Sequence, residues 1–141
     1  MIKKPLVSII TVSYNSEKTI SKTIESVINQ TYKNIEFIII DGKSTDKTLE
    51  IIKLYKKNIS KIICEKDDGI YYAFNKGLKL YSGDLIGFVN SDDVLMPNAL
   101  EILVKYYNKH KEKDFFFGSV KKHWGVLHGF KPWKIYFTWG F

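Results

Sequence analysis

Short runs of apolar, β-prone residues alternate along this sequence with segments whose apolar side chains recur at helical spacing. The expected strands are residues 6–12, 35–40, 59–64, 85–89 and 115–117. The expected helices are residues 17–30, a segment capped by Ser44-Thr45-Asp46, residues 70–81, and a segment opened by Pro97. Strands that alternate with helices are typical of domains in which crossover helices connect parallel strands. The sequence therefore predicts an α/β domain with a mainly parallel sheet.

Length and composition limit the class of protein further. The chain has 141 residues, which suffice for one domain with a core but not for two. No run of about 18 apolar residues occurs, which excludes a membrane-spanning helix. The single cysteine, Cys64, excludes a disulfide framework and a zinc site built from cysteines. We expect a reduced, inert thiol in a cytoplasmic protein.

The charge of the chain bears on its partners. The net charge is +7, and all 22 basic residues are lysines. A basic balance is compatible with nucleic acid, an anionic membrane surface or a phosphorylated substrate. Nucleic-acid binding is disfavoured, because arginine is absent and the lysines are scattered along the chain rather than gathered on one helix.

Polar clusters follow four of the expected strands. They are Ser13-Tyr14-Asn15, Asp41, residues 65–68 and Ser91-Asp92-Asp93. In open parallel sheets, ligands bind outside the carboxyl ends of the strands. The four clusters therefore predict one pocket at that edge of the sheet.

Two phosphate-binding motifs are disfavoured, and a metal-binding pattern remains. Gly42-Lys43-Ser44 lacks the glycine that a phosphate-binding loop requires at position 37, which is Phe37, and no Gly-x-Gly-x-x-Gly follows the first strand. Ser91-Asp92-Asp93 offers paired carboxylates, which suit Mg²⁺ or Mn²⁺ bridging the phosphates of a nucleotide diphosphate. The alternative is that these aspartates only cap a helix.

Four segments in order resemble the family 2 glycosyltransferases with a GT-A fold, especially bacterial enzymes of surface-polysaccharide synthesis. These segments are residues 7–15, 41–46, 65–77 and 90–93, and the resemblance runs from about Pro5 to about Gly118. It implies a Rossmann-like α/β/α sandwich in which residues 1–118 bind the nucleotide-sugar donor. Residues 119–141 would be an aromatic, basic segment that begins an incomplete acceptor region.

The resemblance also implies roles for residues at the base and the ribose. Val12 and Tyr14 would line the base-binding end, and Asp41 would accept a hydrogen bond from uracil. Asp92 would face the ribose or the sugar, and Asp93 would bind the metal ion, Mn²⁺ or Mg²⁺. The alternative for Asp41 is a turn-forming role with the residue that follows it.

Asp67 and Lys76 would lie beside the nucleotide, where an ammonium suits a diphosphate. Glu65 is a less specific member of the same pocket. The alternative for Lys76 is a solvated lysine on the surface of its helix. Tyr71 and Tyr72 are interpreted as packing or rim residues, and position 72 departs from the family pattern, which often has aspartate there.

The family's usual catalytic base has no counterpart in the sequence. An inverting transferase needs a base for the acceptor hydroxyl, yet no acidic residue follows Asp114, so no catalytic residue is assigned. We therefore expect the acceptor half to be absent. Residues 115–141 hold ten of the 21 aromatic side chains, which we expect to pack against a missing continuation or a second copy of the chain. The alternatives are peripheral contact with an anionic membrane and stacking on single-stranded nucleic acid.

The leading hypothesis is an inverting, hexosyltransferase-like glycosyltransferase. It would transfer a sugar from a nucleotide-diphosphate donor, a UDP-sugar, to a glycan or lipid-linked acceptor in cell-surface polysaccharide synthesis. Such a protein would be cytoplasmic or peripheral at the inner face of the cell membrane. The alternative is a non-catalytic fragment or assembly module that binds the sugar nucleotide.

Overall fold

The computed structural model describes residues 4–116, 121–122 and 125–126. The chain divides into two compact units. The first, residues 4–101, holds the sheet and the polar strand ends, and the second begins at Ile102. The predicted domain boundary at residue 118 lies outside the described residues.

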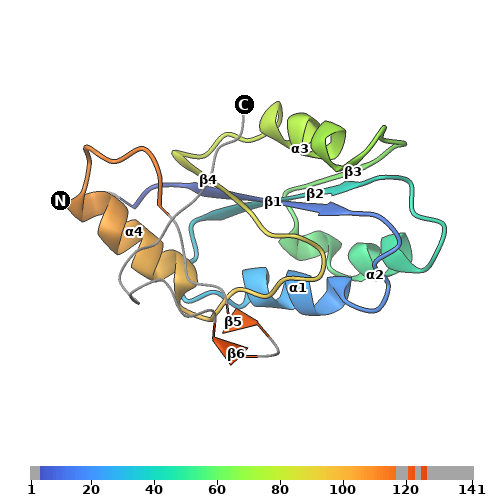
Figure 1. Cartoon of the computed structure of the whole chain (residues 1–141), viewed down its shortest axis with the longest axis horizontal. Coiled ribbons are helices and arrows are strands. Elements are labelled where there is room, and N and C mark those ends of the chain that lie inside the picture. Colours follow the sequence, from blue (N-terminus) through green and yellow to red (C-terminus); the bar gives the residue numbers. More distant parts are fainter. Residues whose placement is uncertain (1–3, 117–120, 123–124, 127–141) are drawn as a thin grey trace. The chain divides into compact units, whose positions relative to one another are not determined.

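The first unit is built on a parallel sheet of four strands, as the alternating pattern predicts. The strands are β1 (Val7–Ser13), β2 (Ile35–Asp41), β3 (Lys61–Cys64) and β4 (Leu85–Phe88). They lie in the order β3-β2-β1-β4 (Figure 1). In this register Ser13 pairs with Asp41, and Asp41 pairs with Cys64. The last residues of three strands therefore lie side by side.

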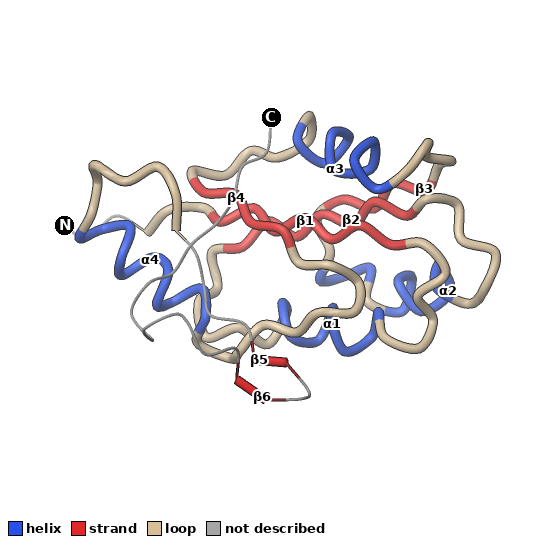
Figure 2. Tube along the Cα trace, in the orientation of Figure 1, coloured by secondary structure: helices blue, strands red, loops and turns tan. Residues whose placement is uncertain are grey.

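Helices cover both faces of the sheet (Figure 2). On one face lie α1 (Ile20–Ile28) and α2 (Thr48–Leu54), and on the other lies α3 (Ile70–Leu78). A 3₁₀ turn, Lys56–Asn58, leads from α2 into β3. All seven residues of β1 are buried, including the polar Ser8, Thr11 and Ser13, because helices cover both faces of this central strand. The predicted α/β/α sandwich with a mainly parallel sheet is confirmed.

Close packing of α3 on β1 depends on a glycine. A Cβ atom added at Gly77 would lie 2.6 Å from Ile10 Cγ2, closer than two carbon atoms can approach. Ile10 is fully buried, and so cannot swing away into solvent. Glycine at position 77 therefore sets the distance between the helix and the sheet, and with it the position of the loop that precedes α3.

The second unit departs from the predicted strand at residues 115–117. Phe115 and Phe116 lie in no strand, and Phe117 is outside the described residues. Phe116 is buried, with its ring edge-to-face on Tyr107 at a centroid distance of 6.3 Å. The predicted strand is wrong for Phe115 and Phe116: Phe116 is buried by an aromatic contact with a helix rather than by strand pairing, and Phe115 is 47% exposed.

The rest of the described second unit is small. Helix α4 (Ala99–Lys109) runs from the first unit into the second, and β5 (Lys121–Lys122) pairs antiparallel with β6 (Gly125–Val126). No helix within the described residues is long and apolar enough to cross a membrane. The expectation that the aromatic tail packs against a continuation or a second copy rests largely on residues outside the described part.

Candidate functional site

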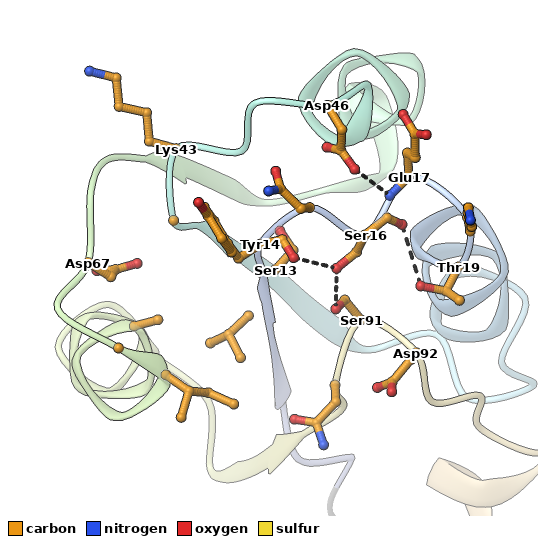
Figure 3. A pocket seen from close by; sticks show the side chains of 18 of the residues that line it. Ser13, Tyr14, Ser16, Glu17, Thr19, Lys43, Asp46, Asp67, Ser91 and Asp92 are labelled. Atoms are coloured by element: carbon orange, nitrogen blue, oxygen red, sulfur yellow. Dashed lines mark hydrogen bonds between the residues drawn. The ribbon is translucent and has the colours of Figure 1, made fainter.

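A cleft of about 1210 Å³ opens at the carboxyl ends of the strands, where the polar clusters were expected to meet (Figure 3). Its walls come from four separate segments of the first unit. These are residues 12–19, the loop after β2 (Gly42, Lys43 and Asp46), the loop before α3 with its first residues (Lys66, Asp67, Gly69, Ile70 and Ala73), and residues 90–92. The predicted gathering of these clusters at one edge of the sheet is therefore observed.

The loops after β1 and β2 are bonded to each other. Asn15 Oδ1 accepts a hydrogen bond from the backbone N–H of Thr45 at 2.8 Å. In return, the backbone N–H of Asn15 donates to Ser44 Oγ at 2.9 Å. Asn15 adopts a left-handed backbone with φ of 49°, which asparagine tolerates better than most residues. The two loops therefore hold Tyr14, which is 63% exposed, at the wall of the cleft.

Asp41 lies beneath the cleft rather than at its surface. It is completely buried, and the residues that line the cleft do not include it. Oδ2 accepts from Ser13 Oγ at 3.0 Å and from Ser44 Oγ at 2.6 Å. Oδ1 accepts from the Ser44 N–H at 2.9 Å and faces the Cys64 thiol at 3.4 Å. All four lone-pair directions of the carboxylate are thus directed at neighbours within the protein.

The carboxylate of Asp41 also affects the pKa of the Cys64 thiol. Burial raises the pKa of Cys64, and the hydrogen bond to Asp41 and its negative charge raise it further. The thiol therefore stays protonated at neutral pH, as expected for an inert cysteine.

Asp67 and Lys76 form an ion pair at one wall of the cleft. Lys76 Nζ lies 2.5 Å from Asp67 Oδ1 and 3.0 Å from Glu65 Oε1, and it donates to the Lys66 carbonyl oxygen at 3.2 Å. Its three N–H groups are therefore matched by three acceptors, and the residues that line the cleft do not include Lys76. The hydrogen bond from Lys76 to Asp67 is the main reason that the pKa of Lys76 is raised. The ammonium stays charged and directed at Asp67.

The acidic turn after β4 places its two aspartates differently. Asp92 lines the cleft, whereas Asp93 is exposed and is not among the lining residues. The Asp93 N–H donates to the Asn90 carbonyl at 3.0 Å, and Asp93 Oδ2 accepts from Asn90 Nδ2 at 3.2 Å. The turn thus bonds to itself and leaves the carboxylate of Asp92 open to the cleft.

The donor chemistry of this turn fits one mode of metal binding. Among the described residues, no group of three or more His, Cys, Asp or Glu side chains is arranged to hold a metal ion. A structural, all-protein metal cage is therefore not present in that part of the chain. Mg²⁺ and Mn²⁺ are also held by one or two carboxylates together with substrate phosphates, and an exposed Asp92-Asp93 pair fits that mode.

The structure thus brings together part of the predicted site. Val12, Tyr14, Asp67 and Asp92 line the cleft, whereas Asp41, Lys76 and Asp93 each contact or adjoin a lining residue without being one. Sequence reasoning missed the segment just before α1, where Ser16, Glu17, Lys18 and Thr19 line the cleft, and also Gly42, Lys43, Asp46 and Ile70. For Ile70, which is half-exposed, the sequence did offer a signal. It is an apolar residue at the first position of α3, directly after a polar loop.

Comparison with known proteins matches the chain to established transferases. The family model described as Glycosyl transferase family 2 matches residues 8–140. The Escherichia coli protein named UDP-Glc:alpha-D-GlcNAc-diphosphoundecaprenol beta-1,3-glucosyltransferase WfaP is 41% identical over 128 residues, which are 82% of this chain and 50% of that protein. Chondroitin synthase of Escherichia coli is 39% identical over 107 residues, which are 74% of this chain and 16% of that protein.

Solved structures show the same relationship. The structure of S. aureus TarS 1-349 in complex with UDP-GlcNAc is 27% identical with a TM-score of 0.76, and the match covers 89% of this chain and 36% of that one. This chain therefore spans half or less of the length of these relatives. Since the family model covers nearly all of the sequence, and the fold agrees with that of the similar solved structure, the chain belongs to glycosyl transferase family 2.

Proposed function

We propose that the cleft binds the nucleotide diphosphate of a sugar donor, UDP in particular, and that this chain supplies the donor half of a glycosyltransferase. The observation that carries the proposal is the convergence of Tyr14, Asp67 and Asp92 from three separate strand ends on one cleft. An elongated, charged ligand suits this arrangement, since an aromatic ring lies on one wall and a carboxylate turn on another. The relatives support UDP as the nucleotide, because WfaP is named for UDP-Glc and TarS has been solved with UDP-GlcNAc.

The charge of the cleft supports a divalent cation in addition to the nucleotide. Its lining residues include four carboxylates, Glu17, Asp46, Asp67 and Asp92, and three ammonium groups, Lys18, Lys43 and Lys66. A diphosphate would thus enter a lining that carries no net positive charge. Mg²⁺ or Mn²⁺ at Asp92 and Asp93 would offset its charge and stabilise the leaving diphosphate.

The reaction proposed for the whole protein is inverting transfer of a sugar to a glycan or a lipid-linked acceptor. In such a transfer, the acceptor hydroxyl attacks the anomeric carbon as the bond to the diphosphate breaks, and a base takes the hydroxyl proton. This chain's part is to hold the donor so that its anomeric carbon faces the acceptor. WfaP, whose name includes alpha-D-GlcNAc-diphosphoundecaprenol, supports a lipid-linked acceptor. A location at the inner face of the membrane belongs to the proposal and depends on such an acceptor. The non-catalytic alternative is disfavoured, because the named relatives are transferases.

Titration calorimetry of the 141-residue chain with UDP, UDP-glucose and UDP-GlcNAc, with and without MnCl₂ or MgCl₂, tests the proposal. We expect one binding site whose affinity rises when the cation is present. Asp92→Asn should weaken binding by at least about tenfold, the effect of losing one charged contact. Glu50→Gln, an exposed change on α2 that does not line the cleft, should leave it unchanged. Absence of UDP binding under every condition would overturn the proposal.

A further inference from the structure

The acidic turn lies in a segment whose two ends are bonded to other elements. At the start of the segment, the Val89 N–H donates to the carbonyl oxygen of Ile10 in β1 at 3.0 Å. At its end, the Leu95 N–H donates to Ser26 Oγ of α1 at 3.1 Å. Residues 90–94, the turn and the residue after it, lie between these two bonds, and the segment runs alongside α1 on its way to α4 (Figure 1). All of these residues belong to the first unit, so the position of the turn in that unit depends on both bonds.

The loop that follows the turn, residues 94–98, gains little from side-chain packing. Val94 is 61% exposed and Met96 is 69% exposed, and within this loop only Leu95 is partly buried. Apolar side chains stabilise a structure in proportion to the area that they remove from water. Hydrogen bonds to the backbone of the loop are therefore what holds it in place.

Gln30, which follows α1, binds this loop with its side chain. The side chain is completely buried. Its Nε2 donates to the Met96 carbonyl oxygen at 2.7 Å and to the Ser26 carbonyl oxygen at 2.9 Å. Its Oε1 accepts the N–H of Leu100, in the first turn of α4, at 3.0 Å. One amide thus joins the end of α1, the loop after the acidic turn and the start of α4.

The two ends of this amide have different tasks, which neither methionine nor glutamate can perform together. Nε2 faces two carbonyl oxygens and must donate twice, whereas Oε1 faces an N–H and must accept. Methionine has a similar length but makes neither bond, and glutamate would place an acceptor before two carbonyl oxygens. Because the first N–H groups of a helix have no partner within it, loss of the amide would also leave the Leu100 N–H unpaired.

The next residue along the chain adds a backbone contact to the same loop. The Thr31 N–H donates to the Pro97 carbonyl oxygen at 2.9 Å, and Thr31 Oγ1 donates to Glu101 Oε2 at 2.7 Å. Together with the contacts above, backbone groups of three consecutive residues, 95–97, are bonded to the end of α1 and the residues that follow it. An element remote in sequence therefore holds the chain two residues after Asp93.

We propose that Gln30 is the positioning residue of the acidic turn, so that the end of α1 sets where Asp92 and Asp93 meet the cation. This inference rests on the proposed function, since it concerns the same two carboxylates. Gln30 does not line the cleft and acts only through the loop that it holds. Once the Met96 carbonyl is released, the two carboxylates would occupy a wider range of positions, and the cation would bind less tightly. The wall that carries Tyr14 would keep its place.

Hydrogen exchange of the ligand-free chain, followed by NMR, tests the mechanical part without any nucleotide. In Gln30→Met, the Leu95 amide should exchange about tenfold faster than in the wild type, or more, because two hydrogen bonds that hold its loop and the start of α4 are lost. The Leu95 N–H does not itself contact Gln30, so its exchange reports whether the loosening reaches the turn. Glu36→Gln is the destabilised control, since it weakens bonds to Ser8 and Lys61 instead. It should speed amides that open by global unfolding but leave Leu95 unchanged.

Cation binding gives the second readout. In Gln30→Met, the Mn²⁺ concentration that half-saturates the UDP complex should rise by about five- to tenfold, because the turn is less firmly placed. UDP affinity measured in EDTA should stay unchanged, which a general loss of structure would not allow. The matched control, Thr31→Val, removes the side-chain bond to Glu101 but keeps the backbone bond to Pro97, and it should alter neither value.

The outcomes separate this inference from the proposed function. Equal exchange at Leu95 in Gln30→Met and the wild type would overturn the inference, whether or not the chain binds UDP. An unchanged half-saturation by Mn²⁺ would overturn it as well. If the wild-type chain binds no UDP, the proposed function fails, and exchange at Leu95 still decides whether Gln30 holds the turn. Should Gln30→Met not fold, Ser26→Ala removes the acceptor of the Leu95 N–H, so that a raised Mn²⁺ half-saturation would support the inference and an unchanged one would contradict it.

Discussion

The hydroxyl oxygens of Ser16 and Ser91 lie 2.8 Å apart, so a hydrogen bond joins the loop after β1 to the acidic turn after β4 (Figure 3). Ser16 Oγ also donates to the Tyr14 carbonyl at 3.2 Å. The wall with the aromatic ring and the wall with Asp92 are therefore coupled through one pair of side chains.

Removal of this hydroxyl pair should loosen the acidic turn. Ser91→Ala should lower the free energy of unfolding by about 1 kcal/mol, the usual value of such a bond. It should also weaken UDP binding in the presence of Mn²⁺ a few-fold, because Asp92 is less firmly placed. Urea denaturation and calorimetry measure the two effects. A double-mutant cycle with Ser16→Ala serves as the control, and strictly additive effects would show that the two hydroxyls are not coupled.

The metal assignment can be tested separately from nucleotide binding. Asp93→Asn should raise the Mn²⁺ concentration that half-saturates the UDP complex by at least about tenfold, because one of two hard anionic ligands is lost. Electron paramagnetic resonance of free Mn²⁺ measures this directly. Asp68→Asn should leave the half-saturation point in place, and an unchanged value for Asp93→Asn would remove Asp93 from the metal site.

A buried carboxylate near the amino end of β2, that of Glu36, should make the free energy of unfolding depend on pH in the acid range. Burial raises the pKa of Glu36, but hydrogen bonds from Ser8, Lys61 and Ser82 outweigh it and lower the pKa to about 2. These bonds are 2.5 Å from Ser8 Oγ, 2.9 Å from Lys61 Nζ and, from Ser82, 2.8 Å (N–H) and 2.9 Å (Oγ). The folded pKa lies below the ordinary value of 4.5, so the stabilisation is present above that value and is lost as pH falls toward 2.

The loss should reach about 3 kcal/mol across this window. Urea denaturation at intervals from pH 7 to pH 2 measures it. Glu36→Gln should be less stable at pH 7 and should lose much of the pH dependence, while Glu50→Gln should retain it. If the free energy of unfolding of Glu36→Gln changed with pH in parallel with that of the wild type, Glu36 would not be the group responsible.

The close contact between α3 and β1 predicts the effect of a single methyl group. Gly77→Ala places Cβ 2.6 Å from Ile10 Cγ2 and 3.0 Å from Cδ1, so the helix must shift. Overpacking costs about 1–3 kcal/mol, whereas the higher helix propensity of alanine returns only about 1 kcal/mol. We expect a net loss of about 1 kcal/mol in thermal or urea unfolding. Asn75→Ala, an exposed change on the same helix, should not destabilise, and an equally stable Gly77→Ala would contradict the packing argument.

Most of the fold is determined locally, and this is why the sequence predicts it. The apolar run at residues 35–40 becomes β2 within one residue, and the periodic segment at residues 70–81 becomes α3 with its start unchanged. The spacing of apolar side chains shows whether a strand is buried on both faces or a helix is buried along one stripe. The edge at which the polar clusters meet follows as well, because parallel strands align their carboxyl ends. The strand expected at residues 115–117 is not formed at Phe115 and Phe116, and Phe116 packs on Tyr107 instead of pairing in a sheet.

The sequence by itself determined the α/β architecture, the family resemblance and the set of polar residues at the strand ends. The tertiary structure alone decided what each of those residues has left to offer a ligand. Asp41 and Asp67 are both aspartates that follow a strand. The carboxylate of Asp41 faces donors from β1, β3 and its own loop, whereas Oδ2 of Asp67 has no hydrogen-bond donor among the described residues. The physical reason is that a carboxylate's capacity depends on donors that are remote in sequence. Only the folded chain shows which of its lone pairs are already used.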